Sequence, residues 1–127
     1  MNTPYPQELT LKSEAVTPVQ LALFAAASGD HNPLHLDPAT AQRAGFERPI
    51  VHGMLSMAIA GRMFTQRFGR DCLRMLHTRF TGVALVGEAL EVGATLERVD
   101  QGEAQYSLRA TTAAGREVLT GTARVRA

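Results

Sequence analysis

Residues 28–35, with the sequence SGDHNPLH, gather the side chains of this chain that are best suited to proton transfer. A carboxylate, Asp30, and an imidazole, His35, stand five positions apart with Pro33 between them. If the proline turns the segment back on itself, these two groups meet and form a general acid/base pair. Asn32 would then orient a water molecule or brace the carboxylate. The segment is therefore a candidate catalytic loop.

Each of these residues also has a structural interpretation. Asp30 after a glycine and Asn32 before a proline both suit turns, and His35 suits a buried, hydrogen-bonded position near the core. His31 is interpreted as a solvated loop residue. The presence of an acid, an amide and two imidazoles within six positions favours the catalytic interpretation of the segment as a whole.

Other site chemistries fit the sequence less well. His31 and His35 have the spacing of metal ligands on one helical face, but Pro33 between them is incompatible with that helix. We therefore predict no metal site. Ser28 lacks the G-x-S-x-G motif of a hydrolase nucleophile, and Cys72 is interpreted as a small core residue.

A second irregular segment, residues 46–53, ends at His52-Gly53, where a long helix is predicted to begin. The first N–H groups of a helix have no partner within it and carry a partial positive charge. Glycine at this point lets a ligand approach the backbone closely, so Gly53 can polarise a carbonyl oxygen. The alternative is that Gly53 only permits close packing of the helix on a sheet.

The elements that must position these two segments predict an α+β domain. Thr17-Pro18 and Asp37-Pro38 each combine a capping side chain with proline at the first helical position. The first of these helices places Val19 and Leu23 at helical spacing. Helices are expected over residues 18–28, 38–44 and 53–68, and strands over residues 7–16, 73–80, 89–99, 104–112 and 118–125.

The helix over residues 53–68 is apolar around most of its circumference, which is typical of a buried helix. An antiparallel sheet is the only element available to cover it, so we predict a curved sheet wrapped around this central helix. The chain of 127 residues has the length of one domain, residues 1–127.

Charge and cysteine content exclude several classes of protein. The 13 basic and 12 acidic residues give a net charge of +1, which argues against nucleic-acid binding. A single cysteine excludes a disulfide-stapled fold. Residues 1–8 lack the apolar stretch of a signal peptide, and residues 50–60 are too short to cross a membrane. We expect a cytoplasmic protein that has no membrane partner.

Two segments resemble the MaoC-like family, which includes (R)-specific enoyl-CoA hydratases and (3R)-hydroxyacyl-ACP dehydratases. Residues 24–41, FAAASGDHNPLHLDPATA, resemble the hydratase signature of that family. Residues 46–61, FERPIVHGMLSMAIAG, resemble its second block at the expected distance, and RFTG at residues 79–82 also fits. The resemblance covers nearly the whole chain and implies a hot-dog fold, in which the sheet wraps around the helix over residues 53–68.

The activity implied by the resemblance is that of a hydro-lyase. Water would add reversibly to a trans-2-enoyl thioester of CoA or ACP and give the (R)-3-hydroxyacyl product, without any cofactor. Such domains form homodimers whose sheets join edge to edge. Two alternatives stay open: a hot-dog acyl-CoA thioesterase, and the catalytic subunit of a heteromeric hydroxyacyl dehydratase.

The resemblance also assigns roles within the two segments. Asp30 and His35 would hold one water molecule as the catalytic pair, with Asp30 as the primary base. Asn32 matches the active-site asparagine of the family. The N–H of Gly53 would bind the thioester oxygen, and the substrate-binding residues predicted at this helix start are Val51, His52, Gly53 and Met54.

Overall fold

The computed structural model describes residues 4–127. Residues 1–3, which begin the polar segment 1–8, lie outside the described residues. One antiparallel sheet has the strand order β1-β3-β4-β5-β2. Its strands are β1 (Glu8–Lys12), β2 (Leu73–Phe80), β3 (Leu90–Asp100), β4 (Glu103–Thr112) and β5 (Glu117–Val125).

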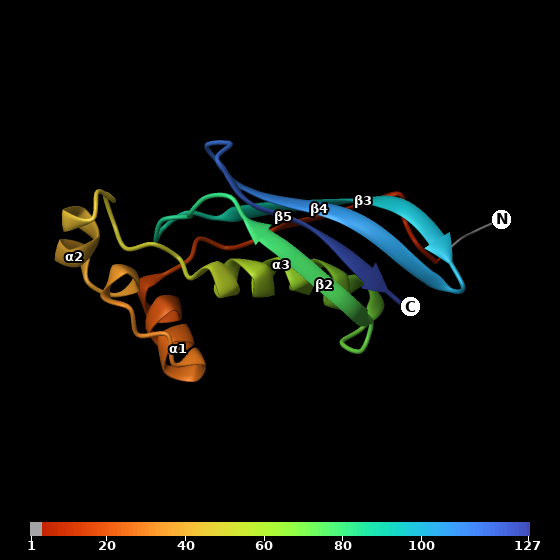
Figure 1. The fold of residues 1–127 in the computed structure, drawn as a ribbon, viewed down its shortest axis with the longest axis horizontal. Coiled ribbons are helices and arrows are strands. Elements are labelled where there is room, and N and C mark those ends of the chain that lie inside the picture. Colours follow the sequence, from red (N-terminus) through yellow and green to blue (C-terminus); the bar gives the residue numbers. More distant parts are fainter. Residues whose placement is uncertain (1–3) are drawn as a thin grey trace.

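The long helix α3 (Gly53–Phe68) runs beneath this sheet, which arches over it (Figure 1). The sheet with α3 against it confirms the predicted α+β arrangement with a central helix. The other helical segments lie beyond the N-terminal end of α3 (Figure 1). These other segments are α1 (Pro18–Ser28), the 3-10 turn η1 (Pro33–His35) and α2 (Pro38–Arg43). Among the described residues, no helix has the length and hydropathy needed to cross a bilayer.

The core lies between α3 and the concave face of the sheet. Alternate residues of β4 are buried, among them Tyr106 and Leu108, because successive side chains of a strand point to opposite faces. The ring of Tyr106 packs against that of Phe64 from α3, with centroids 5.7 Å apart. Burying one such side chain contributes roughly 1.5–3 kcal/mol, so this contact helps to fix the helix against the sheet.

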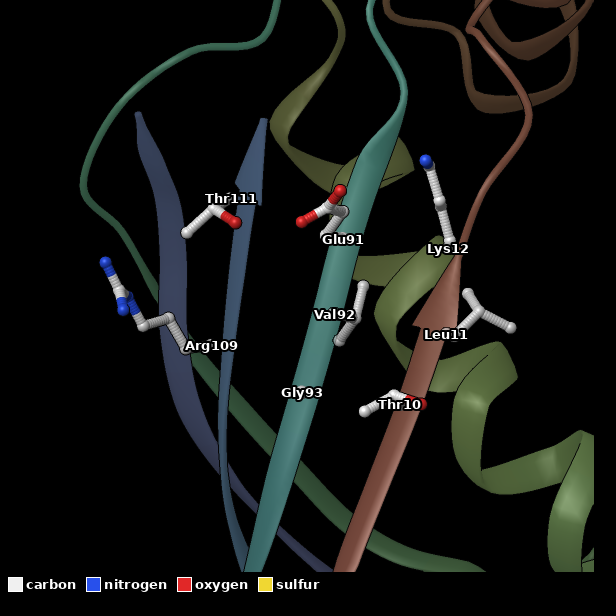
Figure 2. A pocket seen from close by; sticks show the side chains of 8 residues that line it. All are labelled: Thr10, Leu11, Lys12, Glu91, Val92, Gly93, Arg109 and Thr111. Atoms are coloured by element: carbon white, nitrogen blue, oxygen red, sulfur yellow. The ribbon is translucent and has the colours of Figure 1, made fainter. Parts of the chain in front are cut away.

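The outer face of the sheet carries an open hollow over Gly93 (Figure 2). Gly93 pairs with Thr10 on one side and with Arg109 on the other, so the missing side chain leaves a gap between them. Figure 2 shows α3 on the far side of the sheet from these side chains. The hollow is therefore a feature of the outer face and does not adjoin the loop that carries Asp30 and His35.

Two predicted elements differ from the observed ones. The regular strand β1 ends at Lys12 and not at residue 16, although the N–H of Val16 still bonds to the carbonyl of Glu88 at 3.0 Å. Residues Pro33–His35, predicted as an irregular loop, form a 3-10 turn. Proline suits the first position of such a turn because its missing N–H would have no partner there.

Candidate functional site

Three hydrogen bonds join the loop at residues 30–35 to the segment at residues 50–52. The N–H of Ile50 donates to the carbonyl of Leu34 at 3.0 Å, and Nδ1 of His35 donates to the carbonyl of Ile50 at 2.8 Å. Nε2 of His52 donates to the carbonyl of Asp30 at 3.1 Å. The two segments that the sequence singled out therefore form one site at the N-terminal end of α3.

The structure brings the side chains of Asp30 and His35 close together, as the predicted pair requires. The distance from Oδ2 of Asp30 to Nε2 of His35 is 3.5 Å. Because a carbonyl only accepts, the bond to Ile50 requires the proton on Nδ1, and Nε2 of the neutral ring then has a free lone pair. Two acceptors facing each other at this distance can be bridged by one water molecule that donates a hydrogen to each.

The two groups differ sharply in exposure. The side chain of Asp30 is 52% exposed, whereas that of His35 is 10% exposed. A ligand can therefore reach the pair from the side of the carboxylate, while the imidazole is held in place by its surroundings.

Short-range hydrogen bonds shape the loop itself. The N–H of Asp30 donates to Oγ of Ser28 at 3.2 Å, the N–H of Asn32 to Oδ1 of Asp30 at 3.3 Å, and the N–H of Leu34 to Oδ1 of Asn32 at 3.0 Å. Gly29, with φ of 81°, ends α1 in the left-handed conformation that glycine adopts without strain. Asp30 and Asn32 therefore do stabilise the turn through their side chains. Because Oδ1 of Asp30 accepts from Asn32, Oδ2 is the oxygen that faces His35.

Asn32 is exposed and caps η1 through its Oδ1, which leaves its amide Nδ2 as the group that can contact a ligand. We expect Asn32→Ala to lower the unfolding free energy by about 1 kcal/mol, since the cap is lost. Asn32→Ser keeps a capping oxygen, so it should unfold like the wild type yet lose about tenfold in kcat because the amide donor is gone. Denaturant unfolding and steady-state kinetics measure the two effects. Full activity of Asn32→Ser would restrict Asn32 to its capping role.

The carbonyl of Ile50 is held by a second layer of backbone bonds. The N–H of Val51 donates to the carbonyl of Ala84, and the N–H of Val86 donates to that of Pro49, both at 2.8 Å. The side chain of Val51, one of the predicted substrate-binding residues, is buried in the core. Its backbone instead helps to fix the carbonyl that orients His35.

The start of α3 is left without a side-chain cap. Thr17 caps α1 and Asp37 caps α2, but among residues 4–127 no side chain bonds to the first N–H groups of α3. The N–H groups of Leu55 and Ser56 bond to the carbonyl of His52, which precedes the helix. The two N–H groups before these belong to Gly53 and Met54, and that of Gly53, the first of the helix, is suited to bind an oxygen with partial negative charge.

The surroundings of Gly53 are compact but open on one side. A Cβ atom at this position would lie 3.3 Å from the ring of Phe80, which is half exposed. Met54, the next residue of α3, is exposed at the surface. The predicted contacts of Gly53 and Met54 with a ligand therefore agree with their accessibility.

His52 lies beneath His35, and its side chain is buried. The two imidazole rings are stacked with centroids 3.7 Å apart and an angle of 17° between planes. Phe24 meets His52 edge-on with centroids 4.9 Å apart. Burial lowers the pKa of His52, and the neighbouring His35 lowers it further, although the bond to the carbonyl and the charge of Asp30 act in the opposite direction. The predicted substrate-binding residue His52 thus lies behind His35, buried among side chains of the site.

The donor atoms of Asp30, His35 and His52 all lie within 4.8 Å of one another, which raises the question of a metal ion. A metal is bound along the in-plane lone pair of each imidazole. Because the two rings are stacked and nearly parallel, their lone pairs do not converge on one point. Nδ1 of His35 and Nε2 of His52 are also committed as donors. The arrangement suits proton transfer better than shared metal binding.

An apolar cavity of about 350 Å³ adjoins His35 on the side of α1 and α2. Its walls combine aliphatic and proline side chains with a single imidazole, the composition of a site that takes an apolar group next to a polar reaction centre. The lining residues are Pro18, Leu21, Ala22, His35, Leu36, Pro38, Pro49 and Val86.

Sequence reasoning missed two parts of this site. The carbonyl of Ile50 carries no side-chain signal, so no pattern of residue types indicates it. Phe24 stands three residues after Leu21, so the two share a face of α1, but the apolar pattern of α1 does not show that this face meets His52.

Residues 2–117 match the family model described as a MaoC like domain. The chain is 39% identical over 111 residues to the (R)-specific enoyl-CoA hydratase of Aeromonas caviae, covering 84% of this chain and 83% of that protein. The solved structure of an A. caviae (R)-hydratase involved in PHA biosynthesis gives a TM-score of 0.87 at 32% identity, over 94% of this chain and 93% of that chain. R-hydratase PhaJ1 from Pseudomonas aeruginosa gives 0.86 at 32% identity, over 95% and 79%. These neighbours confirm the hot-dog fold.

Several relatives are much longer proteins. The peroxisomal hydratase-dehydrogenase-epimerase of Neurospora crassa is 39% identical over 77 residues, which is 61% of this chain and 8% of that protein. The 3-hydroxyacyl-thioester dehydratase Y of Mycobacterium tuberculosis is 35% identical over 100 residues, which is 76% of this chain and 34% of that protein. The chain thus corresponds to a small part of these proteins, but to most of the A. caviae hydratase.

Proposed function

Because the chain belongs to the MaoC-like dehydratase family, we propose that it is an (R)-specific enoyl-thioester hydratase. It adds water reversibly to the double bond of a trans-2-enoyl-CoA and forms the (R)-3-hydroxyacyl thioester. The observation that carries this proposal is the placement of Oδ2 of Asp30 and Nε2 of His35, two acceptors 3.5 Å apart at the uncapped start of α3.

Hydration requires a nucleophilic water, and the acceptor pair provides the means to position one. The water donates one hydrogen to the carboxylate of Asp30 and one to Nε2 of His35. As its oxygen bonds to C3 of the substrate, Asp30 takes one proton as the primary base. Positioned general-base catalysis of this kind contributes about 10²–10⁴-fold to the rate.

The electrons of the double bond then move toward the thioester, whose oxygen gains negative charge as an enolate. The N–H of Gly53 and the dipole of α3 stabilise that charge. Asp30 returns the proton it took from the water to C2, the enolate becomes a thioester again, and one water has been added in total. In this proposal Nδ2 of Asn32 braces the water or the carboxylate during both proton transfers.

The substrate class follows from the same surroundings. The apolar cavity beside His35 supports a substrate with an alkyl part. The proposed reaction needs no metal or redox cofactor, since both proton transfers and the charge stabilisation are supplied by residues of the chain. The cytoplasmic location expected from the sequence stays a prediction, and relatives in other organisms are peroxisomal.

We further propose that the chain works as a homodimer. Strand β2 is an edge of the sheet, and beside it α3 exposes an open apolar groove of about 390 Å³. An unpaired strand edge next to an apolar groove favours pairing with a second copy. The apolar and small residues that line this groove are Met54, Met57, Ala58, Gly61, Leu73 and Leu76.

The direct test is an assay of the purified chain on crotonyl-CoA and longer trans-2-enoyl-CoAs. We expect the absorbance of the conjugated enoyl thioester to fall as water is added, with (R)-3-hydroxyacyl-CoA as the product on chiral analysis. An (S) product, or no change in absorbance with any of these substrates, would contradict the proposal.

The same assay separates the alternatives. A thioesterase would release free CoA thiol without forming a hydroxyacyl product, and a thiol reagent detects that release. The catalytic subunit of a heteromeric dehydratase would be inactive alone and become active with a second chain. Activity of the purified chain by itself therefore supports the homomeric hydratase.

A further inference from the structure

His52 contacts both members of the acid/base pair without facing the solvent. Its side chain is 1% exposed. Its Nε2–H is bonded to the backbone carbonyl of Asp30, and its ring lies parallel to that of His35 at a centroid distance of 3.7 Å. No other residue among those described combines a hydrogen bond to one member of the pair with a ring stack on the other.

We propose that His52 is a positioning residue of this site: its Nε2–H fixes the backbone of Asp30, and its ring fixes the plane of His35. The inference rests on the proposed function, because it assigns His52 a role in the same reaction. The role differs from that of a ligand-binding residue, since His52 acts only through Asp30 and His35.

The choice of histidine at this position is not explained by packing. The ring lies between His35 and the edge of Phe24, a place that a phenylalanine ring would fill as well. Nδ1 of His52 has no hydrogen-bond partner among residues 4–127, and a buried acceptor without a partner destabilises the folded chain. What histidine adds, relative to phenylalanine, is the bond from Nε2 to Asp30.

The buried ring of His52 is suited to the neutral form. Two imidazolium cations at this separation would repel each other. The titratable groups that face His52 are His35 and Asp30. Burial lowers the pKa of His52 and so favours the neutral ring, in which Nε2–H donates to the carbonyl of Asp30.

Two substitutions separate the hydrogen bond from the stack. His52→Phe keeps a flat ring and removes the Nε2–H, whereas His52→Gln keeps a donor close to the position of Nε2 and removes the ring. We expect His52→Phe to lower kcat about tenfold with KM nearly unchanged, and to have a thermal midpoint equal to or above that of the wild type. His52→Gln should recover part of the lost kcat. His77→Phe, an exposed histidine of β2, is the matched control and should behave like the wild type.

The ¹⁵N and ¹³C NMR signals of the same proteins test the geometry without any substrate. In the wild type, His52 should be in the neutral Nε2–H form, and the carbonyl signal of Asp30 should shift in His52→Phe and return toward its wild-type position in His52→Gln. Wild-type kcat in folded His52→Phe, or a His52 ring that carries its proton on Nδ1, would overturn the inference. If the wild type lacks hydratase activity, the proposed function fails, and the NMR signals alone decide whether His52 positions the pair.

Discussion

Asp30→Asn is expected to lower kcat at least about 100-fold while the thermal midpoint barely moves. The carboxylate is the exposed member of the pair, so the folded chain loses little when its charge is removed. Its local role survives, because Oδ1 of asparagine can still accept from the N–H of Asn32. The oxygen that faces His35 can be replaced by an amide NH₂, which cannot take a proton from water. Steady-state kinetics and thermal unfolding of the same preparation measure both effects.

His35→Asn tests the other member of the pair under the same conditions. The amide Nδ2 of asparagine can take the place of Nδ1 of His35 and donate to the carbonyl of Ile50, but nothing replaces Nε2. His35→Ala is a poorer test, because it leaves that carbonyl without its partner and removes a buried ring. We expect His35→Asn to lose at least about 100-fold in kcat and to stay folded.

The matched control for the lost charge is Asp71→Asn, an exposed carboxylate in the turn after α3. It should keep wild-type kinetics. If Asp30→Asn or His35→Asn unfolds while its folded fraction has normal specific activity, that residue is structural and the proposed reaction loses its base.

The limits of several helices and strands were predicted well, because the residues that start or end these elements are their neighbours in the sequence. Thr17-Pro18 and Asp37-Pro38 start α1 and α2 at the predicted residues, and Gly29 ends α1. Strand β2 was predicted with its observed limits, Leu73–Phe80, and α3 with the limits Gly53–Phe68. Capping and turn chemistry depend on neighbours in the chain, so one sequence is enough to read them.

The orientation of α1 could not be read in the same way. The predicted spacing of Val19 and Leu23 is helical, but both side chains are exposed, and the buried residues are Leu21 and Ala25. Nearly every residue of α1 is apolar, so the pattern does not distinguish one face from another. The contact of Phe24 with His52 depends on that orientation and was therefore not predicted.

In the site too, a contact within one short segment could be predicted, whereas contacts between segments far apart in the sequence could not. The turn of residues 30–35 brings Asp30 to His35, and both ends of that contact belong to one short segment. The carbonyl of Ile50 and the stacked ring of His52 come from a segment more than ten residues later, and they reach the loop only through the folded backbone. His52 was predicted as part of the site, but only the folded structure shows that its ring lies buried beneath that of His35.

Gly53→Pro is expected to lower kcat by about 10²–10³-fold relative to Gly53→Ala, because proline lacks the N–H that we propose to hold the thioester oxygen. The fold should accept this proline. Other helical segments of this chain already begin with proline at the first position, as at Pro18 and Pro38, and His52 has φ of −55° and ψ of 134°, the extended conformation that a residue before proline prefers.

Gly53→Ala is the control because it adds the same Cβ atom and keeps the N–H. In both variants that atom would lie 3.3 Å from the ring of Phe80, whose half-exposed side chain has room to turn aside. Any loss shared by the two variants therefore reports the effect of the Cβ atom, and the additional loss in Gly53→Pro reports the replacement of the N–H by the Cδ of the proline ring. Equal kcat values for the two folded variants would remove Gly53 from the reaction and leave the enolate charge to be stabilised by another donor.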